Sequence, residues 1–204
     1  MWILGIVICS FGVAILSIAS FGLGVIQGPS YAIYLKLSDT FPGFTFGISS
    51  YLMEALFLLL LCIILKKFRW KYLLSFGTAF LFGLALDAWR LAVGTSVPES
   101  LLLRVLLLIG GILSTSFAVA CYFRTDMPLE VWELFIKEIS DRFNLDTAKF
   151  KWIFDILMLV AGIILCFIFF GSFRFDIIGI GTIASAAFGG PLIAFWGKIL
   201  DRAA

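Results

Sequence analysis

Long apolar stretches constrain this chain more than any other feature. Residues 56–65 read LFLLLLCIIL, and residues 101–123 read LLLRVLLLIGGILSTSFAVACYF. An α-helix needs roughly 20 apolar residues to cross the hydrocarbon core of a bilayer. Hydrophobic residues make up 62% of the 204 residues and charged residues only 14%, whereas a soluble domain has about half and about a quarter. We therefore predict an all-α polytopic membrane protein.

The hydrophobic pattern predicts six spanning helices, at 2–20, 48–66, 71–93, 101–123, 150–171 and 177–198. The first is interpreted as a span and not as a signal peptide, because it lacks a basic n-region and is long for an h-region. Two further segments are shorter, carry charges and begin near a proline, which suits the first turn of a helix. They predict short helices at 29–40 and 128–142 that do not cross the bilayer.

The predicted elements occur twice in the same order: span, short helix, span, span. This divides the chain into a first membrane repeat, 1–95, and a second, 100–204. Local matches support the division, such as Pro29 with Pro128 and FGT (76–78) with IGT (180–182). Three spans in each half predict an inverted repeat, as in many transporters. If the short helices cross the membrane, each half has four spans and the repeat is parallel.

The basic residues predict the orientation. Most Lys and Arg, including the cluster KKFRWK at 66–71, fall on the side that holds both termini. Cytoplasmic loops carry an excess of these residues. We therefore expect a multi-pass protein of the cytoplasmic membrane, the bacterial inner membrane, with both termini in the cytoplasm.

Charged residues within the predicted spans are the first candidates for a site. Asp87 and Arg90 are three residues apart, so they share a helix face and can pair. Glu54 on the antiparallel neighbouring span can join them. A charge in a bilayer is costly and usually faces a cavity or another charge. Two interpretations stay open: an ion pair that fixes packing, or a substrate or proton site.

Glu54 and Asp155 lie in the first turns of corresponding spans of the two halves. An inverted repeat relates them by its twofold axis, which is what a pair of gates or coupling sites requires. Chance placement of two acids near the surface explains the pattern equally well.

Small residues recur at four-residue spacing in two spans, and such strips are where helices pack closely in membranes. The strips predict helix-packing roles for Ala79, Gly83, Gly181, Ser185, Gly189 and Pro191.

Several function classes are disfavoured by composition. The chain has no histidine, which excludes a Ser–His triad and an H-E-x-x-H zinc site. The four cysteines have no C-x-x-C spacing and suit small core residues. A net charge of +2 is too small to indicate nucleic acid as a partner. We expect no enzyme, no metal and no cofactor; an intramembrane enzyme is the least favoured class.

Two segments resemble the YitT/YczE-type family of bacterial integral membrane proteins. One is FGLGVIQGPSYAIYLKLSDTFPGFTFGISSYLMEALFLLL (21–60), and the more specific one is IIGIGTIASAAFGGPLIAFW (177–196). The resemblance covers nearly the whole chain, and Lys151 with Asp155 fits the family's basic-then-acidic spacing. The chain departs where Ser30-Tyr31 and Leu129-Glu130 follow the prolines. The resemblance implies a fold and a membrane location, but no settled activity.

The first functional hypothesis is a small-molecule transporter or permease with its site between the two repeats. Backbone groups exposed at Gly- and Pro-broken segments can bind substrate there. The candidate substrate-binding or coupling residues are Pro29, Ser30, Tyr31, Glu54, Asp87, Arg90 and Asp155. The alternative is a non-transporting substrate-binding or accessory subunit that works with partner proteins. The expected partners are the lipid bilayer, an unknown small-molecule substrate, and either a second copy of the chain or a partner subunit.

Overall fold

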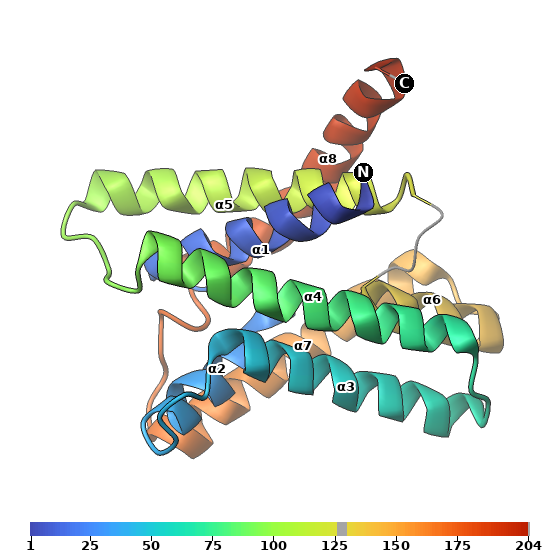
Figure 1. Ribbon diagram of the computed structural model, residues 1–204, viewed down its shortest axis with the longest axis horizontal. Coiled ribbons are helices and arrows are strands. Elements are labelled where there is room, and N and C mark those ends of the chain that lie inside the picture. The colour runs from blue at the N-terminus through green and yellow to red at the C-terminus, as the bar shows by residue number, and fades with distance from the viewer. Residues whose placement is uncertain (126–129, 204) are drawn as a thin grey trace.

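The computed structural model describes residues 1–125 and 130–203, and the regular elements of those residues are all α-helices (Figure 1). Their bounds are α1 Trp2–Ala19, α2 Gln27–Ser38, α3 Phe46–Leu65, α4 Trp70–Val93, α5 Leu101–Tyr122, α6 Val131–Phe143, α7 Thr147–Phe170 and α8 Ile180–Ala203. The order of long, short, long, long helix occurs twice, as the sequence predicts.

Six of these helices are long and apolar enough to cross a membrane: α1, α3, α4, α5, α7 and α8. The other two, α2 with 12 residues and α6 with 13 residues, extend about 18–20 Å at the usual rise, less than the roughly 30 Å of a hydrocarbon core. The prediction of six spanning helices and two short ones is confirmed. The predicted start of the second short helix, at 128, lies outside the described residues.

Side-chain caps explain where several helices begin. The Thr45 hydroxyl accepts a hydrogen bond from the Ile48 N–H at 3.1 Å and starts α3. Asp146 does the same for α7 through the Lys149 N–H, at 2.8 Å. The last helix begins at Ile180 and not at 177, because the Ile177 carbonyl accepts a hydrogen bond from the Leu23 N–H instead of starting a helix. Capping by Thr and Asp satisfies N–H groups that have no partner within the helix.

The centre of the bundle is α1, which packs against both α4 and α5. Its crossing with α5 is close because Gly12 and Gly111 face each other. A Cβ atom on either glycine would lie only 3.0 Å from the carbonyl oxygen of the other. Small residues at a crossing let two helix backbones approach and gain dispersion energy, which drives packing where no water is present. About 67% of the apolar window of α1 is buried.

The last helix has a different environment. Only 6% of the apolar window of α8 is buried. It packs along α5, and its C-terminal end projects beyond the other helices (Figure 1). Exposed leucine, isoleucine and phenylalanine side chains cover this and the other long helices. A surface of this kind is suited to lipid, and it supports membrane insertion of the whole bundle.

Candidate functional site

Asp87 of α4 binds the N-terminal end of α3. Its carboxylate accepts a hydrogen bond from the Thr45 hydroxyl at 2.5 Å and another from the Gly47 N–H at 2.8 Å. The approach depends on two glycines, since a Cβ atom on Gly47 would collide with both the Gly83 carbonyl oxygen and the Asp87 carboxylate. The predicted packing role of Gly83 therefore fits the geometry, and so does that of Ala79, which is fully buried.

Arg90 lies among aromatic rings one turn further along α4. Its guanidinium donates to the Tyr34 hydroxyl at 3.1 Å. The guanidinium carbon lies 4.6 Å from the Tyr34 ring centroid, 5.4 Å from that of Phe46 and 6.0 Å from that of Tyr31. Cation–π contacts of this kind stabilise a cation that has lost its water. Burial raises the pKa of the Tyr31 hydroxyl, with Arg90 acting in the opposite direction.

The predicted ion pair between Asp87 and Arg90 is wrong. The two side chains share a helix face, but each is bound by different partners from α2 and α3. The proposed cluster with Glu54 is wrong as well, because Glu54 lies seven residues beyond Gly47 on α3, about 10 Å along the helix. Helical spacing predicts which side chains share a face. It does not predict which neighbouring helix supplies their hydrogen-bond and ring partners.

The remaining predicted residues of α2 have packing roles here. Pro29 and Ser30 are buried, and the Ser30 carbonyl accepts a hydrogen bond from the Ser49 hydroxyl at 2.6 Å. Tyr31 packs edge-on against Phe46. The structure thus brings Tyr31 to Arg90 and Ser30 to α3, places Pro29 against Gly162 of α7, and places Glu54 and Asp155 elsewhere.

Glu54 reaches the N-terminus of α6. The side chain is only 1% exposed, and its carboxylate is hydrogen-bonded by the backbone of Val131, in the first turn of α6. An acid at a helix N-terminus satisfies free N–H groups and interacts favourably with the helix dipole. The other carboxylate oxygen of Glu54 has no hydrogen-bond partner. Glu54 therefore connects a span of the first half to the short helix of the second.

A cavity of about 480 Å³ lies beside this junction. It is lined by residues of α1 and the segment 24–27 from the first half, and by α5, α6, α7 and α8 from the second. Asp155 lines it, 3.6 Å from the Nζ of Lys151. Ser185 and Gly189, predicted to pack against another helix, line it too.

Two further acids line the cavity, Glu130 and Glu133. Glu130 is only 4% exposed, and each of the two has a carboxylate oxygen without a hydrogen-bond partner. Burial raises the pKa of Glu130 well above its usual range, and the charges of Glu133 and Glu54 raise it further. Burial also raises the pKa of Glu133, with the Lys151 charge opposing. Both acids therefore keep their protons to a higher pH than an exposed carboxyl does.

Glu130 and Glu133 lie in an amphipathic stretch of sequence, and such a pattern favours solvent-facing acids. A signal for another role was present, because both acids lie at the start of the helix that follows a span. Acids at that position can point either into the bundle, toward helix N-termini and other side chains, or outward into water. Within the described residues, no group of three or more His, Cys, Asp or Glu is arranged to hold a metal ion.

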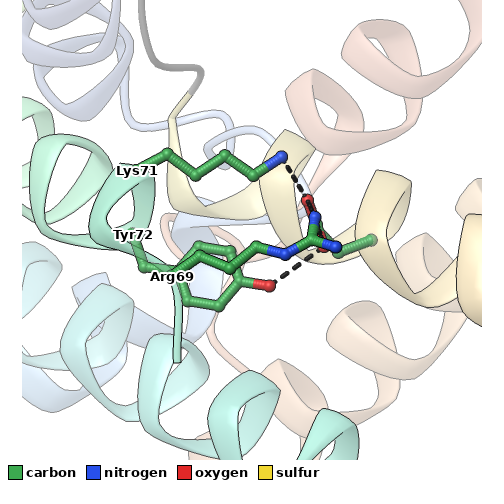
Figure 2. Close-up of polar contacts among 4 residues, drawn as sticks. Arg69, Lys71 and Tyr72 are labelled. Carbon is green, nitrogen blue, oxygen red and sulfur yellow. Dashed lines mark hydrogen bonds and ion pairs between the residues drawn. The ribbon is translucent and has the colours of Figure 1, made fainter. Parts of the chain in front are cut away.

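The far end of α6 is fixed by a different acid. Glu138 forms ion pairs with Lys71 at 2.6 Å and Arg69 at 3.2 Å, and it accepts a hydrogen bond from the Tyr72 hydroxyl at 2.9 Å. Figure 2 shows Arg69, Lys71 and Tyr72 reaching together from the start of α4. Burial raises the pKa of Glu138, but the hydrogen bonds from Lys71 and Tyr72 and the two cations outweigh it and lower the pKa. This clamp ties α6 to the start of α4, because both carboxylate oxygens of Glu138 have partners.

The small residues of α8 follow the packing prediction only in part. Gly181 packs as predicted, because a Cβ atom there would lie 2.7 Å from the Gly22 carbonyl oxygen. A Cβ atom on Gly189 would meet nothing within 4 Å, and Pro191 is exposed. The packing role predicted for Gly189 and Pro191 is therefore wrong, whereas Ser185 is half-buried and its enclosed hydroxyl has no hydrogen-bond partner. This part of α8 faces the cavity or the outside of the bundle.

Comparisons with known proteins extend over the whole chain. Residues 1–198 match the family described as a family of unknown function, DUF6198. The chain is also 30% identical over 203 residues to the uncharacterized protein YyaS of Bacillus subtilis (strain 168), covering 98% of this chain and 92% of YyaS. No solved structure matches the chain. On the match over residues 1–198, the chain belongs to the DUF6198 family.

Proposed function

We propose that the chain is a small-molecule transporter of the cytoplasmic membrane, with its substrate site in the cavity between the two halves. The observation that carries the proposal is the cavity itself, which both halves line and into which Glu130, Glu133 and Asp155 project charge. Polar groups at such a depth in a membrane bundle most often mark a substrate or ion pathway. The resemblance to the YitT/YczE-type family is part of this proposal, beside the DUF6198 membership.

An inverted repeat is the second part of the proposal, and helix packing supports it. The first-half helix α1 packs on α4 as its counterpart α5 packs on α8. The short helix α2 packs on α7, and its counterpart α6 packs on α3. An exchange of partners between halves is what a twofold axis between them produces. Transporters built this way place the substrate at the interface of the repeats.

The two halves differ in how their last two spans pack, which suggests how the cavity opens and closes. The hairpin of α3 and α4 is closed at Gly47 and Gly83. Among the described residues, α7 and α8 are not a closely packed pair, and the cavity lies between them. Movement of α8 onto α7 reproduces the packing of α4 on α3 and closes the cavity on that side. Alternating access requires a motion of this kind.

The transport hypothesis can be tested by access to one position, Ser185, on the cavity wall of α8. Ser185→Cys is placed in a background without the four native cysteines and treated with a membrane-impermeant thiol reagent from each side of the membrane. A transporter predicts labelling from both sides in turn. Ile183→Cys, 69% exposed on the outer surface of the same helix, is the control and should stay unlabelled. Labelling of Ser185→Cys from one side alone contradicts transport and favours an accessory subunit.

Orientation and flux complete the test. With both termini in the cytoplasm, Phe68→Cys should be protected from an external reagent and Val97→Cys should be open to it. The reverse pattern contradicts the orientation. Uptake or counterflow by the purified chain alone in liposomes supports a transporter, whereas binding without flux supports a substrate-binding subunit.

A further inference from the structure

The acids around the N-terminus of α6 lack the partners that buried charges require. Glu54 and Glu130 are 1% and 4% exposed, and each has a carboxylate oxygen without a hydrogen-bond partner. The half-buried Glu133 has one as well. Buried carboxylates are normally paired or hydrogen-bonded, since an uncompensated one is strongly destabilising. An unpartnered acid aimed into a cavity indicates a missing positive group, either a proton or a ligand.

The charges that face these acids do not neutralise them. The titratable groups near Glu130 and Glu133 from neighbouring elements are Cys9 of α1, Glu54 of α3, Tyr122 of α5, and Lys151 and Asp155 of α7. Lys137 and Asp141 of α6 itself also line the cavity, and together they add no net charge to it. The cations that α4 directs at α6, Arg69 and Lys71, are engaged by Glu138. Of the two cations that line the cavity, Lys137 has Asp141 on the same helix and Lys151 is shared with Asp155.

Most of the remaining cavity wall is apolar, although Gln27, Thr115 and Thr147 also line it. It includes Val13, Leu16, Phe123, Trp132, Ile136 and Ile193. A volume of about 480 Å³ is within the range of small-molecule sites and far exceeds that of a bare ion. A largely apolar wall that also carries acids matches a ligand with an apolar body and one positive group. Aromatic side chains such as Trp132 and Phe123 add favourable contacts with a cation.

We propose that this cavity binds an amphiphilic organic cation, which exchanges with a proton held by Glu130 and Glu133. In the empty site one of the two acids holds a proton, because burial and the charge of Glu133 both oppose ionisation of Glu130. When the cation binds, that proton leaves to bulk water and the carboxylate left behind pairs with the cation. The transport step that follows from this exchange rests on the proposed function, while the binding step does not.

Binding is tested on the purified full chain in detergent, with tetraphenylphosphonium as the probe. The free probe is measured by equilibrium dialysis at about pH 6 and about pH 8. Both values lie above the pKa of an ordinary glutamate, about 4.3. Exchange with one proton predicts tighter binding at the higher pH, by up to about tenfold per pH unit. In weakly buffered solution, about one proton should appear for each cation bound. Binding that does not depend on pH overturns the proposal, as does equal displacement by millimolar Mg²⁺.

Variants assign the effect to the two acids. Glu130→Gln and Glu133→Gln should each abolish proton release and weaken binding at the higher pH by at least about tenfold. Glu99→Gln, on the exposed segment between α4 and α5, is the matched control and should behave as the unaltered chain. Each variant must elute as a single species in gel filtration, and two variants are used so that misfolding of one leaves the other. Unchanged binding and proton release in both variants overturns the site.

A transport arm separates this inference from the proposed function. The chain is reconstituted in liposomes of phosphatidylethanolamine and phosphatidylglycerol, and probe accumulation is measured under a pH gradient. Proton release in detergent without accumulation supports the site and contradicts the transporter. Accumulation that Glu130→Gln and Glu133→Gln leave unchanged supports the transporter and overturns the assignment of these acids.

Discussion

The two halves of the chain have the same order of helices, but Asp87 of the first half and Glu130 of the second have different environments. In the first half, α3 and α4 close on each other at Gly47 and Gly83, and Asp87 is bound by two donors. In the second half, the cavity lies between α7 and α8, and Glu130 has a carboxylate oxygen without a partner. The comparison indicates that Asp87 is structural because it lies where two helices meet, whereas Glu130 is available to a ligand because it lines a cavity.

Arg90 and Lys151 extend the same contrast to the cations. Arg90 is enclosed by three aromatic rings and the Tyr34 hydroxyl. Lys151 is half-exposed and faces a cavity with more than one acid. A cation in a closed aromatic cage stabilises packing, whereas one on a cavity wall can change partner when a ligand enters. The predictions below test this division.

The largest effect is expected from Asp87→Ala in the closed half. The change leaves the Thr45 hydroxyl and the Gly47 N–H without their acceptor and removes two charge-assisted hydrogen bonds. Such losses predict a fall in the free energy of unfolding of about 3 kcal/mol. Unfolding in mixed detergent micelles measures it. Asp39→Ala, at the exposed end of α2, is the control, and an equal effect in both variants contradicts the structural role of Asp87.

In the open half, stability should fall as pH rises. The folded pKa values of Glu130 and Glu133 are raised, so the folded chain keeps protons that the unfolded chain has lost. The decline begins above the unfolded pKa of about 4.3 and ends at the folded pKa, with a slope of at most about 1.4 kcal/mol per pH unit for one carboxyl. Unfolding measured across this range tests it.

Glu130→Gln should flatten this pH dependence and raise stability at the alkaline end, because it removes a buried charge. Asp87→Asn should leave the slope as it is. A slope that persists in both Glu130→Gln and Glu133→Gln shows that other groups carry it and contradicts the comparison.

A smaller effect is expected from Glu138→Gln, at the clamped end of the same short helix. Lys71 and Arg69 are half-exposed in these ion pairs, so screening limits their value, and a loss of about 1 kcal/mol is expected. Since the pKa of Glu138 is lowered, its contribution is present above the unfolded pKa and is lost as pH falls through the folded pKa. Acid titration of stability measures it; a loss that instead grows only as pH rises contradicts the clamp.

The smallest expected effect is the interaction free energy between Asp87 and Arg90, which should be near zero. Asp87 and Arg90 have separate partners, so the effects of Asp87→Asn and Arg90→Ala should add to within about 0.5 kcal/mol. A double-mutant cycle of unfolding free energies measures the difference. An interaction above about 1.5 kcal/mol means that the pair exists after all and that the closed half depends on an ion pair.

The sequence alone determined the class of fold and the order of its elements. Spanning helices follow from local composition, because a bilayer requires about 20 apolar residues with internally satisfied backbone groups. The short helices at Gln27–Ser38 and Val131–Phe143 were predictable for the same local reason, since each combines a proline near its start with charges and limited length. The close approach at Gly83 also followed from a local pattern of small residues.

The tertiary structure decided which polar group met which partner. Asp87 and Arg90 share a face in any helix, yet the Gly47 N–H and the Tyr34 ring, from two other helices, proved to be their partners. The burial of Glu130 depends on how α3, α6 and α7 meet, and no spacing along one helix encodes that. Hydrogen bonds and ion pairs are chosen by distances of a few ångströms between elements far apart in sequence, and only packing fixes those distances.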